Sequence, residues 1–435
     1  MIQLKHICIC MGVLIGLAGI HSCSLDDGGG STSTPALTLD LNQELSLTNL
    51  SWNAVNVTDF REYIILQSVD VIPDSPIPVV NSTTTVVKRI DDADITTHAG
   101  INILFSPRTC YKLYAAIGER FLYSPTVCVD KGITLLPGFY DRVDHEPGQQ
   151  EIVMYDRNDN MLSTYTLGGT VINKSVGETF FSNPSIDVST YNGIQNVFIS
   201  DQSQLTIKRY NLPNLNSGFS KGFNAGIDAL TSYGPYLFAV LNSSFSSFQV
   251  LNRNTLTAFD TRDGNTLEFG RTLAVFPGDS LIVLEVGLSN TNRYVINDAG
   301  KIIKEDQYPI AVSQSNLQGS TAQGENIFIT GFRGTIFNNA AQVVGELNPE
   351  FFGNILDVEL SSDENTAVGL ISNNVTFSLQ YFDVTDPSNI SVKKKLDLPQ
   401  GSFSEILIEN NNVYLFGVTF DSGQSQTFIL QLPIY

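Results

Sequence analysis

The feature that most constrains the fold is a repeat in the C-terminal part of the chain. From about residue 133 onward, apolar strand-like segments recur, and each ends in a polar residue, usually Asp or Asn. These two residues suit a turn between strands because both tolerate a left-handed backbone. Successive end residues are 55, 41, 45, 41, 45 and 48 positions apart: Asp156, Asn211, Asn252, Asn297, Asn338, Asp383 and Gln431.

Each repeat contains several short strands. A second apolar strand precedes six of the end residues, as in "YLFAVL" and "LIVLEV", and a further strand comes before it, as in "EILIEN". Three or four strands in every 40 to 50 residues are typical of a β-propeller blade. The pattern predicts an all-β chain with a propeller over residues 133–435, with seven blades favoured and six as the alternative count. A β-helix or a second sandwich would be the competing folds.

The two ends of this repeat region are incomplete. Gln431 lies almost at the C-terminus, so the last blade lacks an outer strand. A strand from the start of the domain could fill that position and close the ring. The first blade has no clear inner strands, and "GFYDRVDHEP" must supply them.

Residues 36–130 carry a different pattern of short alternating strands separated by turn residues, which is typical of a β-sandwich. The succession "LSWNAV", "YIILQS" and "YKLYAAIGERFLYSPTVCV" resembles a fibronectin type III domain. An immunoglobulin-like relative would show much the same pattern. The resemblance implies that Trp52, the only tryptophan, is the core residue of the second strand.

Two cysteines, Cys110 and Cys128, lie in this sandwich segment. A hairpin with its turn near 118–120 would place them directly opposite each other on antiparallel strands. We therefore predict a disulfide, which an exported protein would retain, although two free buried thiols are the alternative. Two cysteines and two histidines in the body of the chain are too few for a zinc site.

The N-terminus predicts export. Lys5 precedes 14 uncharged residues that end at Ile20, too few for a membrane-spanning helix and typical of a secretory signal. The sequence "GIHSC" resembles the lipobox of bacterial lipoproteins, which implies that residues 1–22 are a signal peptide and that Cys23 is acylated. Residues 23–35 then form a flexible tether. The acidic "SLDD" resembles the surface-export signal of Bacteroidetes lipoproteins, which implies an outer-membrane, cell-surface location.

Composition excludes some functions. The chain has 24 Lys and Arg against 44 Asp and Glu, a formal net charge of −20, so a nucleic-acid partner is not expected. Nucleophilic triads generally need a histidine base, and we interpret His98 and His145 as surface-loop residues. The segments 156–160 and 260–265 lack the ligand pattern of an EF-hand loop. We predict no catalytic residue, no metal and no cofactor.

The remaining candidates are aromatic residues in loop-like contexts. Tyr233, Tyr236, Phe351 and Phe352 are hypothesised ligand-binding residues, with packing at a strand start as the alternative for the two phenylalanines. The favoured function is a non-catalytic surface lipoprotein that binds a glycan or peptide, or supports an outer-membrane uptake complex with a transporter. The alternative is a glycoside hydrolase or lyase with a carboxylate or tyrosine site in the central funnel.

We expect palmitate labelling of the expressed protein to disappear in Cys23→Ala, because that thiol is the predicted attachment point and acyl chains hold such a protein at the membrane. Labelled cells fractionated into membrane and soluble parts provide the measurement. An alanine variant that stays membrane-bound would show that the first 20 residues are an uncleaved helix.

Overall fold

The computed structural model describes residues 36–434, apart from 44–46, 103–107, 131–132, 150, 157, 175–183, 202–204, 243–245, 264–270, 288–289, 310–320, 350–352, 374–375, 399–401 and 422–423. Within these residues every regular element is a β-strand. The same residues include no helix that is long and apolar enough to span a membrane. The predicted signal peptide, the tether and Cys23 lie outside the described residues.

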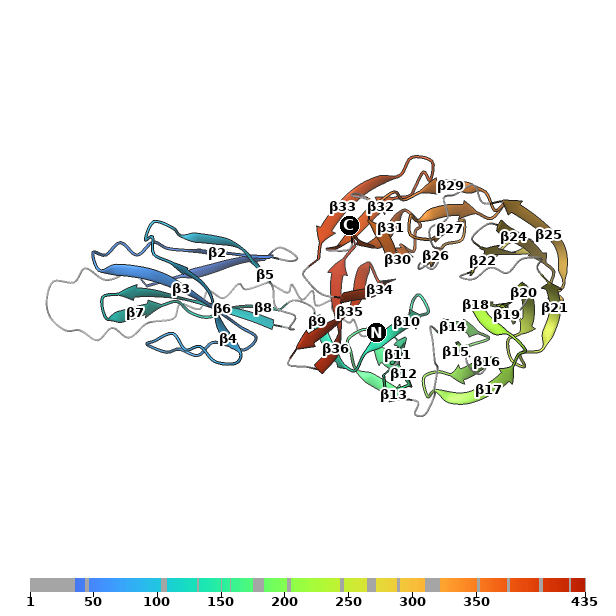
Figure 1. The fold of residues 1–435 in the computed structure, drawn as a ribbon, viewed down its shortest axis with the longest axis horizontal. Helices are drawn as coiled ribbons and strands as arrows, with labels where there is room; N and C mark the ends of the chain where they lie inside the picture. Colours follow the sequence, from blue (N-terminus) through green and yellow to red (C-terminus); the bar gives the residue numbers. More distant parts are fainter. Residues whose placement is uncertain are drawn as a thin grey trace, which may run out of the picture. The chain divides into compact units, whose positions relative to one another are not determined.

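The first eight strands form two antiparallel sheets that face each other across an apolar core (Figure 1). Trp52 is 5% exposed and packs edge-on against Tyr63, with ring centroids 5.4 Å apart, so its predicted core position is confirmed. The resemblance to fibronectin type III stays a prediction. One sheet has the order β1 (Leu39–Gln43), β2 (Leu47–Trp52), β5 (Thr97–Asn102); the other has β4 (Thr84–Ile90), β3 (Phe60–Ser68), β6 (Arg108–Ile117), β7 (Arg120–Tyr123), with β8 (Val127–Asp130) also paired to β6.

The predicted disulfide joins Cys110 of β6 to Cys128 of β8, which are direct partners in the strand register. The hairpin differs slightly from the expected one. Its turn has only two residues, because Ile117 pairs with Arg120. One extra residue must therefore be absorbed before β8. It falls between Ser124 and Val127, because Ser124 still bonds to Leu113: its Oγ accepts the backbone N–H of Leu113 at 3.1 Å and its own N–H donates to the Leu113 carbonyl at 2.9 Å.

The strands from residue 133 onward form a seven-bladed β-propeller, as predicted: the described residues build seven four-stranded sheets around a ring (Figure 1). Neighbouring inner strands contact one another all the way round, including the last and the first. From inside to outside the first four blades are β10 (Tyr140–His145), β11 (Glu151–Asp156), β12 (Met161–Thr166), β13 (Val171–Lys174); β14 (Ile186–Tyr191), β15 (Ile194–Asp201), β16 (Thr206–Asn211), β17 (Asn216–Gly222); β18 (Gly226–Tyr233), β19 (Tyr236–Asn242), β20 (Ser246–Asn252), β21 (Ala258–Asp263); and β22 (Thr272–Phe276), β23 (Leu281–Val286), β24 (Asn290–Ile296), β25 (Ile302–Pro309).

The seventh blade closes the ring in the predicted way. Its outer strand is β9 from the start of the domain, which pairs antiparallel with the last strand of the chain, so that Ile133 lies opposite Leu430. The last three blades are β26 (Thr321–Gln323), β27 (Ile327–Thr330), β28 (Thr335–Asn338), β29 (Val343–Glu346); β30 (Asn354–Leu360), β31 (Thr366–Ser372), β32 (Phe377–Asp383), β33 (Ser391–Asp397); and β34 (Ser402–Glu409), β35 (Asn412–Asp421), β36 (Gln424–Pro433), β9 (Ile133–Pro137).

One of the seven end residues lies on a different strand from the others. Asp156 ends the second strand of its blade, whereas Asn211 ends the third strand of the next blade. Thr166 is the true counterpart at the end of a third strand. Asp156 resembles the other end residues in sequence because it too begins a turn: its carboxylate accepts the backbone N–H groups of Asn158 and Asp159. This shift explains the outlying spacing at the start of the repeat.

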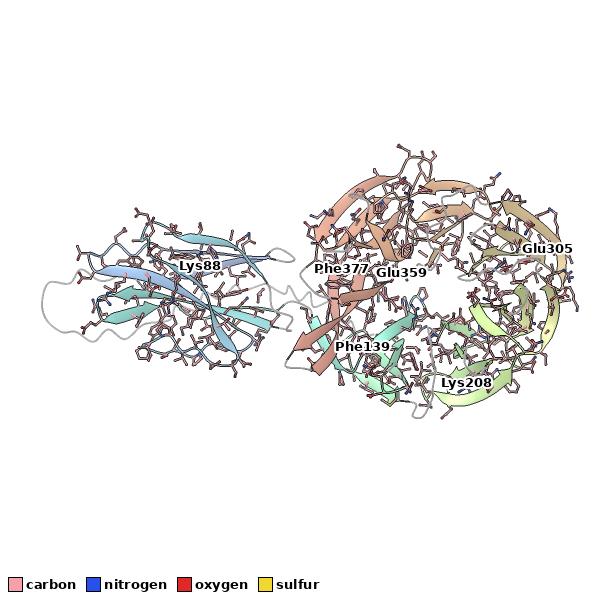
Figure 2. The ribbon with its side chains drawn as sticks, in the orientation of Figure 1. Lys88, Phe139, Lys208, Glu305, Glu359 and Phe377 are labelled. Atoms are coloured by element: carbon pink, nitrogen blue, oxygen red, sulfur yellow. A yellow bond between two sulfur atoms is a disulfide. The ribbon has the colours of Figure 1, made fainter. Side chains whose placement is uncertain are left out.

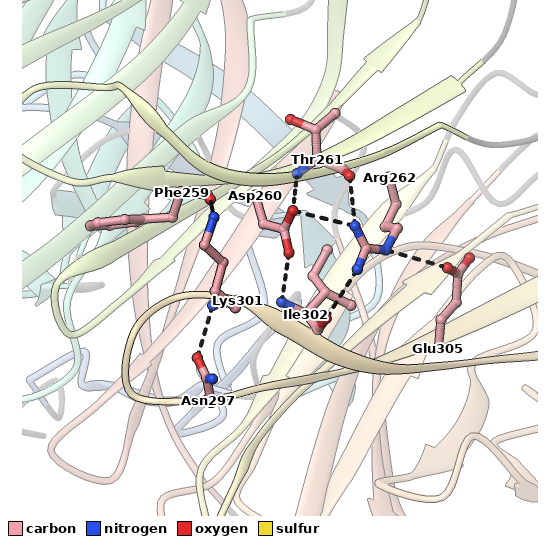
Figure 3. A network of polar contacts seen from close by, with 8 residues as sticks. All are labelled: Phe259, Asp260, Thr261, Arg262, Asn297, Lys301, Ile302 and Glu305. Carbon is pink, nitrogen blue, oxygen red and sulfur yellow. Dashed lines mark hydrogen bonds and ion pairs between the residues drawn. The ribbon is translucent and has the colours of Figure 1, made fainter.

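Blades are also joined at the outer rim. Asp260 on β21 accepts the backbone N–H of Ile302 on β25 at 2.9 Å, and Arg262 donates to the carbonyl of Ile302 at 3.0 Å (Figure 3). Lys301 donates to the carbonyl of Phe259. These contacts tie the outer strand of the third blade to that of the fourth, so this acidic segment has a structural role.

Replacing both bridged cysteines, in Cys110→Ala/Cys128→Ala, should lower the free energy of unfolding of the sandwich by about 3 kcal/mol, because the bond closes a short loop in the unfolded chain. Urea titration followed by tryptophan fluorescence measures this domain alone, since Trp52 is the only tryptophan. An unchanged midpoint would contradict the expectation.

Candidate functional site

The inner strands of the propeller carry a recurring acidic residue that binds the next blade. Asp144 Oδ2 accepts the backbone N–H of Val188 at 2.7 Å, and Asp187 Oδ1 accepts that of Ser232 at 3.0 Å. The described residues show this pattern at five junctions between blades. The remaining three donor–acceptor pairs are Arg271 N–H to Asp228, Ile406 N–H to Asp357 and Val143 N–H to Glu405.

This arrangement gathers carboxylates around the centre of the ring. Burial raises the pKa of Glu405 to about 8, against the opposing effect of Arg142. Burial, and then the charge of Asp187, raises the pKa of Asp144 well above its ordinary value. Glu359 of β30, on the inner side of the ring (Figure 2), has a pKa raised by burial and by Asp357. Part of this group is therefore protonated near neutral pH.

The two histidines differ from their interpretation as surface-loop residues. His98 lies on strand β5 and is half-buried. His145 ends the inner strand β10, is buried, and has its Nε2 3.7 Å from a carboxylate oxygen of Glu409 on the neighbouring inner strand. Burial lowers the pKa of His145, and Glu409 acts in the opposite direction. The segment 138–147 supplies the inner strand of the first blade, as expected, but the contact between His145 and Glu409 joins strands far apart in the sequence, so no local pattern indicated it.

The two candidate tyrosines flank one tight turn and have different environments. Tyr233 ends β18 and is 43% exposed, so its ring is available to a ligand. Tyr236 begins β19, packs in the core and donates its hydroxyl to the carbonyl of Asp298 at 2.7 Å. Its burial gives it a packing role, so only Tyr233 of this pair remains exposed at the surface. Phe351 and Phe352 lie outside the described residues.

The turn that carries Tyr233 lies next to a buried cation that the sequence did not indicate. Arg253 follows β20, and its backbone N–H donates to the carbonyl of Pro235 at 2.9 Å. Its guanidinium lies over the ring of Phe198, 5.3 Å from the centroid, and 6.0 Å from that of Tyr191. Strands in a blade alternate in direction, so the turns after the first and third strands lie on the same face of the ring. Tyr191, Tyr233 and Arg253 therefore share one face, between the second and third blades.

The described residues contain no group of three His, Cys, Asp or Glu side chains placed to hold a metal ion. In the two segments that were compared with a calcium-binding EF-hand loop, 156–160 and 260–265, the first acid accepts hydrogen bonds from other parts of the protein. Asp156 accepts the N–H of Phe139 at 3.1 Å in addition to its turn contacts, and Asp260 is committed at the outer rim.

Comparison with known proteins shows the fold alone. The solved structure of U3-55K superposes with a TM-score of 0.54 at 11% sequence identity, over 69% of this chain and 98% of the other. The β-propeller domain of Cps50 (Swd1) from Myceliophteria thermophila gives a TM-score of 0.50 at 12% identity, over 69% and 99% of the two chains. No protein-family model and no curated protein matches the sequence.

Glu405→Gln should stabilise the propeller at pH 8 and have little effect at pH 5. The folded state keeps a proton on Glu405 that the unfolded chain releases near its ordinary pKa of 4.5, so this contribution to stability is lost as the pH rises from 4.5 to about 8. Gln cannot titrate and still offers an oxygen to Val143. We expect the melting temperature at pH 8 to rise by about 2–4 °C, for a net effect near 1 kcal/mol.

Differential scanning calorimetry at both pH values measures this effect. The matched control is Glu325→Gln, which changes an exposed carboxylate of the same propeller and should leave the pH dependence as it is. A Glu405→Gln protein that is equally destabilised at both pH values would mean that Glu405 is ionised and paired with Arg142.

Proposed function

We propose that this chain is a non-catalytic binding protein, anchored by an acylated Cys23 at the cell surface, whose propeller captures a glycan or peptide for an outer-membrane uptake complex. The lipobox-like "GIHSC", the acidic residues after it and the polar tether support the anchor and the location. The propeller supports the binding role by analogy of fold, since such rings commonly present ligand-binding loops.

The observation that carries the proposal is the use of the inner-strand carboxylates. A hydrolase or lyase of this architecture needs acids that are free to reach a substrate. Here Asp144 and Asp187, with three further acids, accept backbone N–H groups from neighbouring blades. An acid that holds two blades together is poorly placed to exchange a proton with a ligand, so recognition is assigned to the turns and not to the centre.

One observation favours the enzymatic alternative. A carboxyl group protonated near pH 7 can act as a general acid, and burial raises the pKa of Glu405 to about 8. Glu359 shares this tendency and lies on the inner side of the ring. A glycosidase or lyase would use Glu359 as the acid, because Glu405 is bonded to Val143 and Arg142.

A single experiment separates the two functions. The full chain is run in native gels cast with individual polysaccharides, and the same gels are assayed for newly formed reducing ends. We expect retarded migration without cleavage, and we expect Tyr233→Ala to reduce the retardation. Tyr123→Ala is the matched control, because Tyr123 is an equally exposed tyrosine of the sandwich.

Cleavage that disappears in Glu359→Gln would contradict the binding function and support the enzyme. A peptide ligand is tested in parallel by pull-down from solubilised outer membranes, where co-purification of a transporter would support the uptake complex. The proposal would be overturned if the correctly folded protein showed no retardation in the gels and no co-purifying transporter.

A further inference from the structure

Arg253 is a buried cation with unused hydrogen-bonding capacity. The residue is 1% exposed, and its Nη2 donates to the carbonyl of Ser189 on the inner strand β14. Its Nε and Nη1 have no acceptor among the described residues. Buried guanidinium groups are normally paired or fully hydrogen-bonded, because an unpaired charged donor away from water is costly.

The nearest carboxylates do not supply the missing acceptors. Asp187 and Glu146 raise the pKa of Arg253, against the larger lowering effect of its burial, but neither forms an ion pair with it. Asp187 accepts the N–H and the hydroxyl of Ser232, the latter at 2.6 Å. Glu146 accepts the N–H and the hydroxyl of Thr190. Both acids already have other donors, so they leave two guanidinium nitrogens of Arg253 available.

A second arginine reinforces the positive charge at this place. Arg209 on β16 donates through Nη1 to the carbonyl of Asn254 at 2.8 Å and to its side-chain oxygen at 3.1 Å. Its Nε also lacks an acceptor, and burial lowers its pKa. Two adjacent guanidinium groups, neither of them in an ion pair with a described residue, are unusual in a chain with a formal net charge of −20.

Aromatic side chains surround the guanidinium of Arg253. Tyr191, at the end of β14, is half-buried, and its ring centroid lies 6.0 Å from the guanidinium. Tyr233 lies at the turn whose Pro235 accepts the N–H of Arg253, and its ring is exposed. Guanidinium donors next to the exposed ring of Tyr233 suit a sugar that carries a carboxylate, because the carboxylate accepts from the guanidinium and the C–H face of a sugar ring stacks on tyrosine.

We propose that the face between the second and third blades binds a neutral glycan carrying a single uronic acid, with the uronate carboxylate on Arg253 and an adjacent sugar ring on Tyr233. The Tyr191 side chain turns aside to admit the carboxylate. One acid group fits the electrostatics, since a polyanion would be repelled by the net negative chain, whereas a lone carboxylate feels mainly the two nearby arginines. This inference rests on the proposed binding function and names its ligand class.

The test compares two ligands that differ by one group. Isothermal titration calorimetry of the full chain is performed with xylotetraose bearing one glucuronic acid, with unsubstituted xylotetraose and with the methyl ester of the acidic form. We expect the free acid to bind at least about 10-fold more tightly than either neutral form, which corresponds to one buried charged hydrogen-bonded contact. Equal affinity for the acid and its ester would overturn the proposal without any variant being made.

Variants then locate the site. Arg253→Met should reduce binding of the acidic glycan to the level of the neutral one, and Tyr233→Ala should weaken all three ligands, with Tyr123→Ala as the unaffected control. Because Arg253 is buried, the folding of the Arg253→Met variant is checked by calorimetry. Tyr191→Ala provides a second test of the site that leaves Arg253 in place. We expect Tyr191→Ala to raise the association rate of the acidic glycan only.

The outcomes distinguish failure of the uronate site from failure of the proposed binding function on which it rests. Binding of neutral glycans with no preference for the acid would overturn the uronate site and leave the binding function intact. Cleavage of the tetraose would contradict the function itself. Binding of a peptide through its free C-terminal carboxylate, with no binding of the acidic glycan, would replace the proposed ligand class.

Discussion

The propeller depends on one type of contact, the hydrogen bond from a backbone N–H of one inner strand to an acidic side chain of the preceding blade. Most backbone hydrogen bonds are satisfied within each sheet, so the blades otherwise meet through packed side chains and through separate side-chain hydrogen bonds such as those of Asp260 and Arg253. Such a hydrogen bond contributes about 0.5–1.5 kcal/mol when the carboxyl is protonated and about 1.5–3 kcal/mol when it is ionised. Asp144 and Asp187 show the geometry most plainly, since each reaches the strand that follows.

The same contact has an electrostatic consequence. A ring closed by acids places several carboxylates near one axis, where they raise one another's pKa values and keep protons near neutral pH. The pKa values of Glu405 and Asp144 are therefore raised because of the architecture. A raised pKa at the centre of this ring is weaker support for catalysis than it would be in an isolated cleft. Arg253 presents the opposite case, a cation whose nearest acids are already committed elsewhere.

Local patterns predicted the fold well and the candidate site only in part. The spacing of strand ends predicted seven blades, and the hairpin containing Cys110 and Cys128 predicted their bond, because turn chemistry and alternation are properties of neighbouring residues. Tyr236 was assigned to a loop, yet it packs in the core, since a residue beside a turn can face either way. Arg253 carried no signal at all, because its environment comes from strands of another blade.

The antiparallel pair of β9 and β36 also has a mechanical meaning. Along the chain, the propeller begins at Ile133, the first residue of β9, which closes the ring. Strand β9 is held by hydrogen bonds to a segment nearly 300 residues later, around Leu430. If the chain is tethered at its N-terminal end, a load on a bound ligand passes along the backbone through β9. The hydrogen bonds of that strand pair then lie in series with the tether, so they limit the force that the ring withstands before it opens.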